Sequence, residues 1–260
     1  MLMEYLAKDV ANCLYIYADI SKYGFKDQNL KVWYDKDTDG ICAVVMKYHN
    51  NFQIYSSRDF DKVEEIVALI NEYKPYGVAG RTELIASLEK EFSDRYNVEY
   101  GVIYRGKDIK REKILRALEE CEVKIELASE DDAEAIAKLI CMDDELGSVY
   151  TVESLAEELR ERIHTGMGRS YIIRDGEEIV AHNATYAECD KFVVISGLMV
   201  HPDYRDTEYA QLIDLKSSLE FQEEGKDRYF FAIKPRIIRW HKFTKSLLVA
   251  SYGKLSLINK

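Results

Sequence analysis

Hydrophobic residues gather in three short runs near the start of the chain, and these runs predict β-strands. All three runs are rich in β-branched and aromatic residues. The runs are Leu30–Tyr34, Ile41–Tyr48 and Phe52–Tyr55. Asp39-Gly40 and Asn50-Asn51 separate them, and such dipeptides are typical of hairpin turns. We therefore predict three consecutive strands joined by tight turns.

A helical period follows these runs. Val63, Ile66, Val67 and Ile70 recur at helical spacing and predict a helix over 61–73, which ends before Pro75. The rest of the first half is predicted as a helix over 10–23, a strand over 77–80, a helix from Thr82 and a strand over 98–104. The charged, amphipathic stretch 107–122 is predicted as a linker helix.

The second half repeats this order of elements. Helices that begin at Ser129 and Thr151 precede the strands, and both residues are good N-caps. The later elements are a hairpin of 170–174 and 179–187, a strand over 192–200, a helix over 204–224, a strand over 228–233, a short helix over 235–245, and a closing hairpin of 247–252 and 254–258 around Gly253. We predict an α/β (α+β) protein of two similar domains, 1–115 and 123–260. Each has a mixed, mostly antiparallel central sheet flanked by helices.

The charged residues are unevenly distributed along the chain. The 260 residues carry a formal net charge of −11, which disfavours non-specific binding to nucleic acid. Residues 121–190 hold 6 basic and 18 acidic side chains, whereas residues 191–260 hold 12 basic and 8 acidic ones. The basic final segment has two interpretations: ordinary solvated helix faces, or a site for an anionic ligand.

The composition, and the absence of several common motifs, exclude a number of protein classes. Hydrophobic content of 47% is that of a globular protein, and the longest apolar run is far shorter than the ~18–20 residues of a membrane-spanning helix. The five cysteines are scattered without a Cys-x-x-Cys, so we expect reduced thiols, a cytoplasmic location and no structural metal. The sequence contains no P-loop, no Gly-x-Ser-x-Gly and no His-Glu-x-x-His.

The segment 195–210 is the most informative part of the chain. An apolar strand runs into His201-Pro202, then a loop, then the start of a helix. A loop followed by a helix N-terminus presents free backbone N–H groups and the positive end of the helix dipole. Arg205 adds a positive charge, so the segment predicts an anion site.

This segment resembles the central motif of the GNAT family of N-acetyltransferases, Val-x-Pro-x-x-Arg/Gln-x-x-Gly-x-Gly/Ala. Val200, Pro202, Arg205 and Ala210 match it at the right spacing, and the resemblance covers residues 123–260. It implies acetyl-CoA as the cosubstrate. The pantetheine arm would pair with Leu198, Met199 and Val200. The pyrophosphate would bind the loop formed by Arg205, Asp206, Thr207, Glu208, Tyr209 and Ala210.

The first half resembles a degenerate copy of the same fold. Its corresponding loop, 56–61, lacks the Arg-x-x-Gly-x-Gly/Ala pattern. An unrelated α/β domain is the alternative for this half. A tandem of one degenerate and one intact unit would explain the chain length and the repeated order of elements.

Glu208 departs from the motif because the family has glycine there. Glycine lets the backbone approach phosphate without a Cβ in the way. Two like charges ~4–5 Å apart cost about 3–4 kcal/mol at an effective dielectric constant near 20, and solvent exposure lowers this cost. Three interpretations follow: weak or rearranged CoA binding, a less anionic ligand, or a fold whose role is structural.

Catalytic candidates come from the same resemblance. Family members often place a proton-donating Tyr on the last short helix, and His241 stands near that position here. Tyr252 is a second donor candidate. Glu188 and Asp190 are candidate bases, and Asp143, Asp144 and Glu145 are candidate acceptor-site residues. The alternative for each is an ordinary packing or surface role.

These observations predict an enzyme that transfers the acetyl group of acetyl-CoA to a small-molecule amine by direct attack in a ternary complex. A non-catalytic GNAT-like protein that binds a CoA-like metabolite or a protein partner is the alternative. Aminoacyl transfer is a third option, which the acidic charge disfavours because such enzymes bind RNA. We expect no metal, no nucleic acid and no membrane partner, and a homodimer stays open.

Overall fold

The computed structural model describes residues 1–58, 62–121, 123–144, 147, 150–233 and 246–257. These residues form two compact units. The first unit contains residues 1–105 together with 231–233 and 246–257, and the second contains residues 106–230. Among the described residues, no helix is both long and apolar enough to cross a membrane.

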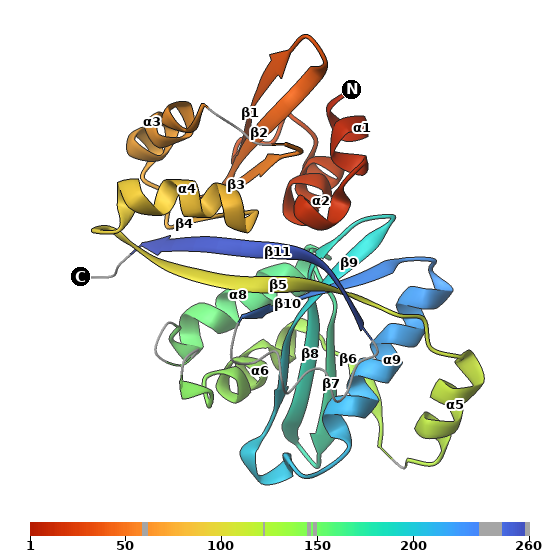
Figure 1. Cartoon of the computed structure of the whole chain (residues 1–260). Helices are drawn as coiled ribbons and strands as arrows, with labels where there is room; N and C mark the ends of the chain where they lie inside the picture. The colour runs from red at the N-terminus through yellow and green to blue at the C-terminus, as the bar shows by residue number, and fades with distance from the viewer. Residues whose placement is uncertain (59–61, 122, 145–146, 148–149, 234–245, 258–260) are drawn as a thin grey trace. The chain divides into compact units, whose positions relative to one another are not determined.

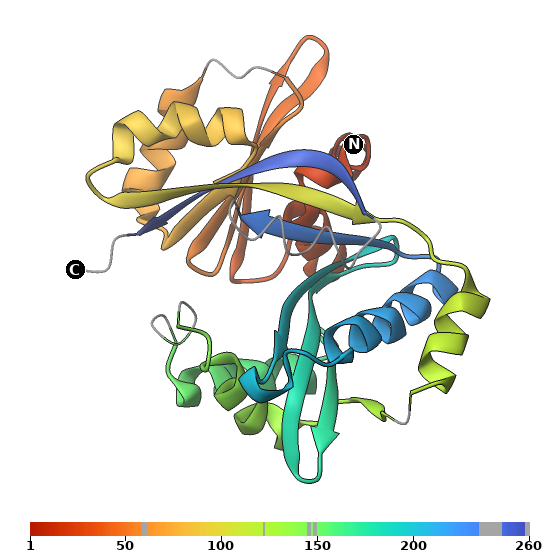
Figure 2. The same cartoon turned by 60° about the horizontal axis from the view of Figure 1, so that its bottom comes forward.

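The first unit contains six strands with helices on both faces (Figures 1 and 2). Its helices are α1 (Leu2–Ala7), the 3₁₀ helix η1 (Val10–Asn12), α2 (Leu14–Tyr23), α3 (Val63–Tyr73) and α4 (Thr82–Phe92). Its strands are β1 (Leu30–Asp37), β2 (Gly40–Tyr48), β3 (Asn51–Ser56), β4 (Gly77–Gly80), β5 (Tyr96–Gly106) and β11 (Ser246–Leu257). The predicted helix over 10–23 is interrupted at Cys13.

The strands of the first unit are ordered β1-β2-β3-β4-β11-β5. The β1–β2, β2–β3 and β4–β11 pairs are antiparallel, whereas β3 and β4 are parallel. The sheet is therefore mixed and mostly antiparallel, as predicted. Phe52, Ile54 and Val78 pack against α3 and α4, and Leu255 of β11 completes the same core.

The predicted closing hairpin around Gly253 is wrong, because Gly253 lies inside the continuous strand β11. A Cβ atom at this position would lie 2.8 Å from Cβ of Ile85 on α4. Glycine is present because helix and strand approach closely, not because the chain turns. The predicted helix over 235–245 lies outside the described residues.

The second unit has five strands and helices on both sheet faces (Figure 2). Its helices are α5 (Arg111–Glu119), η2 (Glu130–Asp132), α6 (Ala133–Ile140), α8 (Val152–His164), η3 (Pro202–Tyr204) and α9 (Tyr209–Glu223). Its strands are β6 (Ile125–Leu127), β7 (Ser170–Asp175), β8 (Glu178–Glu188), β9 (Phe192–Val200) and β10 (Asp227–Ile233). The sheet order is β10-β9-β8-β7-β6, with only β9 and β10 parallel.

The helix α9 differs from a simple amphipathic helix. Leu212 and Leu219 are buried as expected, but Asp214, Ser217 and Ser218 are buried as well. The buried guanidinium of Arg228 on β10 donates to the hydroxyl of Ser218 and to the carbonyl of Lys107. A polar cluster thus joins α9 and β10 with the segment that enters α5.

The two units do not coincide with the predicted domains 1–115 and 123–260. The first boundary falls at Arg105, before α5, and the chain changes unit again after Phe230. The reason is long-range pairing: β11 forms its ladder with β4, from Gly253–Gly80 to Ser256–Gly77.

Candidate functional site

The edge of β9 is the starting point of the candidate site. The strand β10 pairs with β9 from Asp227–Phe192 to Phe230–Ile195, and over the described residues this ladder ends there. The residues of β9 beyond Ile195 continue to pair with β8 on the other side. As far as the structure describes the chain, one edge of this part of β9 is therefore unpaired.

Hydrogen-bond alternation shows which residues face the unpaired edge. The N–H of His201 donates to the carbonyl of Val180 on β8 at 2.8 Å. Because successive residues point to opposite sides, the N–H and C=O of Val200 and Leu198 point away from β8. Met199 instead faces β8, opposite His182, and its side chain packs against α6 and α8. Two of the three predicted strand contacts are thus directed toward the open edge.

Two compensating β-bulges lie next to this edge. Between the pairs His182–Met199 and Ala184–Ser196, β9 has one residue more than β8. Between Thr185–Ile195 and Ala187–Val194, β8 has the extra residue, which is Tyr186. Bulges redirect side chains and are frequent beside active sites. Hydrophobic periodicity did not predict either bulge.

The bulge in β9 contains Gly197, whose φ is +73°. The imidazole Nδ1 of His182 is 2.9 Å from the carbonyl oxygen of Gly197, and Nε2 is 3.3 Å from Oγ of Ser170. The rings of His182 and Tyr186 each lie 3.5 Å from the point that a Cβ of residue 197 would occupy. His182 therefore links β7, β8 and β9 at the bulge.

The pKa of His182 is lowered to about 4, chiefly by burial; the bond to Gly197 opposes this shift, and the charge of Arg162 adds to it. Since the folded-state pKa lies below the usual 6.5, the unfolded state binds more protons in this window. We expect the second unit to keep this stability above pH 6.5 and to lose about 2 kcal/mol of it by pH 5. Urea unfolding at pH 7.5 and pH 5, for the native chain and His182→Asn, measures this loss. An equal loss in both chains would contradict the assignment.

The loop after β9 is fixed by local contacts. The hydroxyl of Tyr204 donates to Asp175 at 2.5 Å, and this bond raises the pKa of Tyr204 to about 12. The ring of Tyr204 stacks on that of Tyr209 with centroids 5.8 Å apart. The hydroxyl of Thr207 donates to the carbonyl of Tyr204 at 2.6 Å. These contacts connect the loop both to the β7–β8 turn and to the first residue of α9.

The start of α9 offers backbone donors. In the described part of the chain, the N–H groups of Glu208, Ala210 and Gln211 donate to no protein acceptor. Arg205, Asp206 and Glu208 are exposed. Glu208 occupies the N-cap with φ −81° and makes no capping bond with its side chain. The backbone here does not require glycine, and the Glu208 carboxylate is free to turn into solvent.

Tyr186 is a site residue that sequence reasoning missed. The Arg162 guanidinium lies 4.2 Å from the centroid of the Tyr186 ring and donates through Nη2 to the carbonyl of Thr185 at 2.8 Å. Burial raises the pKa of Tyr186, and the Arg162 charge opposes this rise. The phenol therefore keeps its proton at neutral pH. Its only sequence signal is that an aromatic residue recurs in a strand, which is too common to single it out.

Glu188, a candidate base, lies in a network of ion pairs. Its carboxylate contacts Arg169 at 2.6 Å and Lys226 at 2.8 Å. Glu224 bonds to the same two cations. Although burial raises the pKa of Glu188, its bonds to Arg169 and Lys226 outweigh this effect and lower it. A carboxylate held ionised by two cations is a poor proton acceptor.

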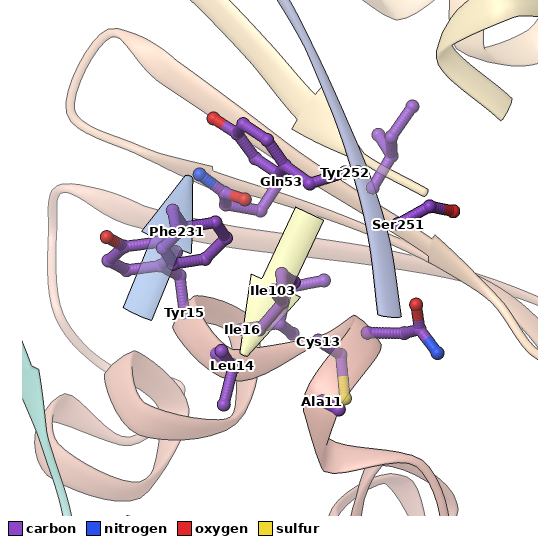
Figure 3. Close-up of a pocket in the computed structure, with 13 residues that line it drawn as sticks. Ala11, Cys13, Leu14, Tyr15, Ile16, Gln53, Ile103, Phe231, Ser251 and Tyr252 are labelled. Atoms are coloured by element: carbon purple, nitrogen blue, oxygen red, sulfur yellow. The ribbon is translucent and has the colours of Figure 1, made fainter. Parts of the chain in front are cut away.

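Of the two predicted catalytic residues, only Tyr252 is among the residues that the structure describes. Tyr252 belongs to the first unit, where it lines a cavity of about 20 Å³ together with Tyr15, Gln53 and Phe231 (Figure 3). The ring of Phe231 meets that of Tyr252 edge-on at 4.8 Å and stacks on Tyr15 at 5.7 Å. Burial raises the pKa of Tyr252. His241 and Glu145 lie outside the described residues.

The corresponding strand end of the first unit is occupied by its own side chains. The N–H of Ser57, just after β3, donates to the hydroxyl of Tyr5 at 3.0 Å. This hydroxyl in turn donates to the carbonyl of Cys42 at 2.7 Å. Tyr5 of α1 thus bonds to backbone groups after β3, whereas the backbone N–H groups at the start of α9 in the second unit have no such partner among the described residues. Among the described residues of both units, no cluster of His, Cys, Asp and Glu has the arrangement of a metal site.

Comparisons with known proteins add the following. No family model matches the sequence. No curated protein sequence matches it either. A GCN5-related N-acetyltransferase-like protein from Streptococcus suis is 12% identical, with 98% of each chain covered and a TM-score of 0.61. A Drosophila protein is 11% identical over 99% of this chain and 94% of its own, with a TM-score of 0.64.

A third similar structure is a GCN5-related N-acetyltransferase from Kribbella flavida. It is 14% identical and covers 84% of this chain and 87% of its own, with a TM-score of 0.54. At these identities the likeness shows the fold alone. The chain has the α/β fold of the GNAT acetyltransferases, which confirms the predicted resemblance and fold class.

Proposed function

We propose that the second unit binds acetyl-CoA along the open edge of β9 and transfers its acetyl group to a small amine. The observation that carries this proposal is the ladder that ends at Ile195 and Phe230. It leaves the N–H and C=O groups of Leu198 and Val200 available for an extended amide-containing arm. The acetyltransferase-type fold supports the same assignment. We further propose that the first unit is a degenerate copy without a ligand of its own.

The residues present fit acetyl-CoA. The amide groups of its pantetheine arm match the donors and acceptors of a free strand edge. Its pyrophosphate matches the free N–H groups at the start of α9 and the charge of Arg205. Glu208 opposes this charge, but its exposed side chain keeps the opposition partial. When bound, acetyl-CoA supplies an activated thioester carbonyl.

The direction of the arm follows from its two ends. If the pyrophosphate lies at residues 205–210 and the arm follows Val200 and Leu198, the acyl end reaches the Gly197 bulge. The Tyr186 ring lies against this bulge. We assign Tyr186 Oη the role of holding the proton needed by the leaving group. Acceptor attack in a ternary complex needs no covalent acyl-enzyme.

Calorimetric titration with acetyl-CoA tests the proposal. We expect the native chain to bind with a Kd on the order of micromolar, which corresponds to about 8 kcal/mol. Release of free CoA thiol in the presence of n-butylamine or 1,4-diaminobutane then tests transfer. Absence of binding at millimolar acetyl-CoA would refute the proposal. Binding without transfer to any amine would instead favour the non-catalytic alternative.

Two charge variants of the loop test where the pyrophosphate binds. We expect Arg205→Glu, which changes the charge by two, to weaken acetyl-CoA binding by about thirtyfold and Glu208→Gln to strengthen it by about fivefold, because exposed charges a few ångströms from an anion contribute about 1 kcal/mol each. Both effects should shrink at 1 M salt. Acetyl-pantetheine, which lacks the pyrophosphate, is the control ligand. Equal effects on both ligands would show that the loop acts through folding instead.

A further inference from the structure

His182 is a polar residue in the interior of the second unit. Its side chain is 0% exposed, and both nitrogens of its imidazole have hydrogen-bond partners. The partners are on different strands: Gly197 on β9 and Ser170 on β7. A buried polar group that is fully satisfied rigidifies its surroundings and specifies one arrangement.

The geometry fixes the tautomer of the ring. The carbonyl oxygen of Gly197 can only accept, so Nδ1 of His182 carries the hydrogen and donates it. The ring is neutral, so Nε2 is left as an acceptor for the hydroxyl of Ser170. The chain of bonds therefore runs from Ser170 through His182 to Gly197, in the same direction throughout.

The carbonyl that His182 holds belongs to the bulged residue. Gly197 has φ +73°, a conformation that a regular strand does not contain. The extra residue shifts the alternation of β9 by one, so it decides which backbone groups beyond it face the open edge. Without the bulge, the alternate set of N–H and C=O groups would face that edge.

We propose that His182 is a positioning residue, whose Nδ1–H holds the Gly197 bulge so that the N–H and C=O groups of Leu198 and Val200 face the open edge of β9. This inference rests on the proposed function, because the edge matters only if an acyl-CoA arm pairs with it. His182 itself takes no part in proton transfer. Its ring nitrogens are both engaged in the strand-to-strand bonds.

Two amide variants test whether the position of the N–H donor matters, and not only the presence of a polar side chain. His182→Asn keeps an N–H donor near the place of Nδ1, whereas His182→Gln places the amide near Nε2. We expect His182→Asn to bind acetyl-CoA within about threefold of the native chain and His182→Gln to bind about tenfold more weakly. Ser170→Ala is the control, since it removes only the partner of Nε2. Urea unfolding confirms that each variant is folded.

Hydrogen exchange of the peptide covering residues 196–200 gives a readout that does not depend on a ligand. We expect faster exchange in His182→Gln than in His182→Asn, with unchanged exchange elsewhere in β8 and β9. Equal acetyl-CoA affinity and equal exchange in the two variants would overturn the inference. If the native chain does not bind acetyl-CoA, the proposed function fails, and the edge then has no arm to position.

Discussion

Leu255→Ala is expected to destabilise the first unit by about 3–5 kcal/mol, although the residue is far along the chain from the rest of that unit. Leu255 is 0% exposed and lies opposite Val78 in the β11–β4 ladder. It packs in one core with Phe52 and Ile85. Truncating a fully buried leucine removes its transfer free energy and leaves a cavity that the neighbours fill only in part.

Urea unfolding combined with hydrogen exchange measures this effect and locates it. Peptides of β3, β4 and α4 should lose protection, whereas peptides of β7 and β8 should keep it. Lys254→Ala is the matched control, because Lys254 is adjacent on β11, faces the opposite side of the sheet and is only partly buried. A loss of protection confined to residues 106–230 would contradict the assignment of β11 to the first unit.

The position of β11 in the sheet could not be predicted from the sequence. Most strands and helices follow from periodicity and turn chemistry, since both are local signals. The helix from Thr82 and the strand 77–80 were predicted with their observed bounds or start. The partner of β11 is not local, and Gly253 was interpreted as a turn because a close helix contact and a turn both select glycine.

The candidate site could likewise be predicted from the sequence only where its residues are contiguous. The loop of residues 205–210 was predicted because its motif is short and contiguous. The open edge of β9 depends on where β10 stops pairing, and neither Ile195 nor Phe230 carries a signal for that point. The roles of Tyr186 and His182 depend on two bulges whose effects cancel in the register, and no sequence pattern in β8 or β9 indicates either bulge.

Tyr186→Phe is expected to lower the turnover number by a hundredfold or more and to leave the Kd for acetyl-CoA within about twofold. Positioned proton donors contribute about 10²–10⁴-fold to a rate. The substitution removes only Oη, so the ring still packs against Gly197 and beneath the Arg162 guanidinium. Steady-state release of CoA thiol, with n-butylamine as acceptor, gives the turnover number, and calorimetry gives the Kd.

Tyr171→Phe is the matched control for this prediction. Tyr171 lies in the same sheet, but its hydroxyl donates to Glu220 on α9 at 2.7 Å, on the opposite face from Tyr186. A general loss of stability would affect both variants, whereas loss of a proton donor affects turnover only in Tyr186→Phe. If both variants keep the native turnover number, the Tyr186 hydroxyl is not the proton donor. His241 and Tyr252, the two donors predicted from the sequence, are then the groups to substitute.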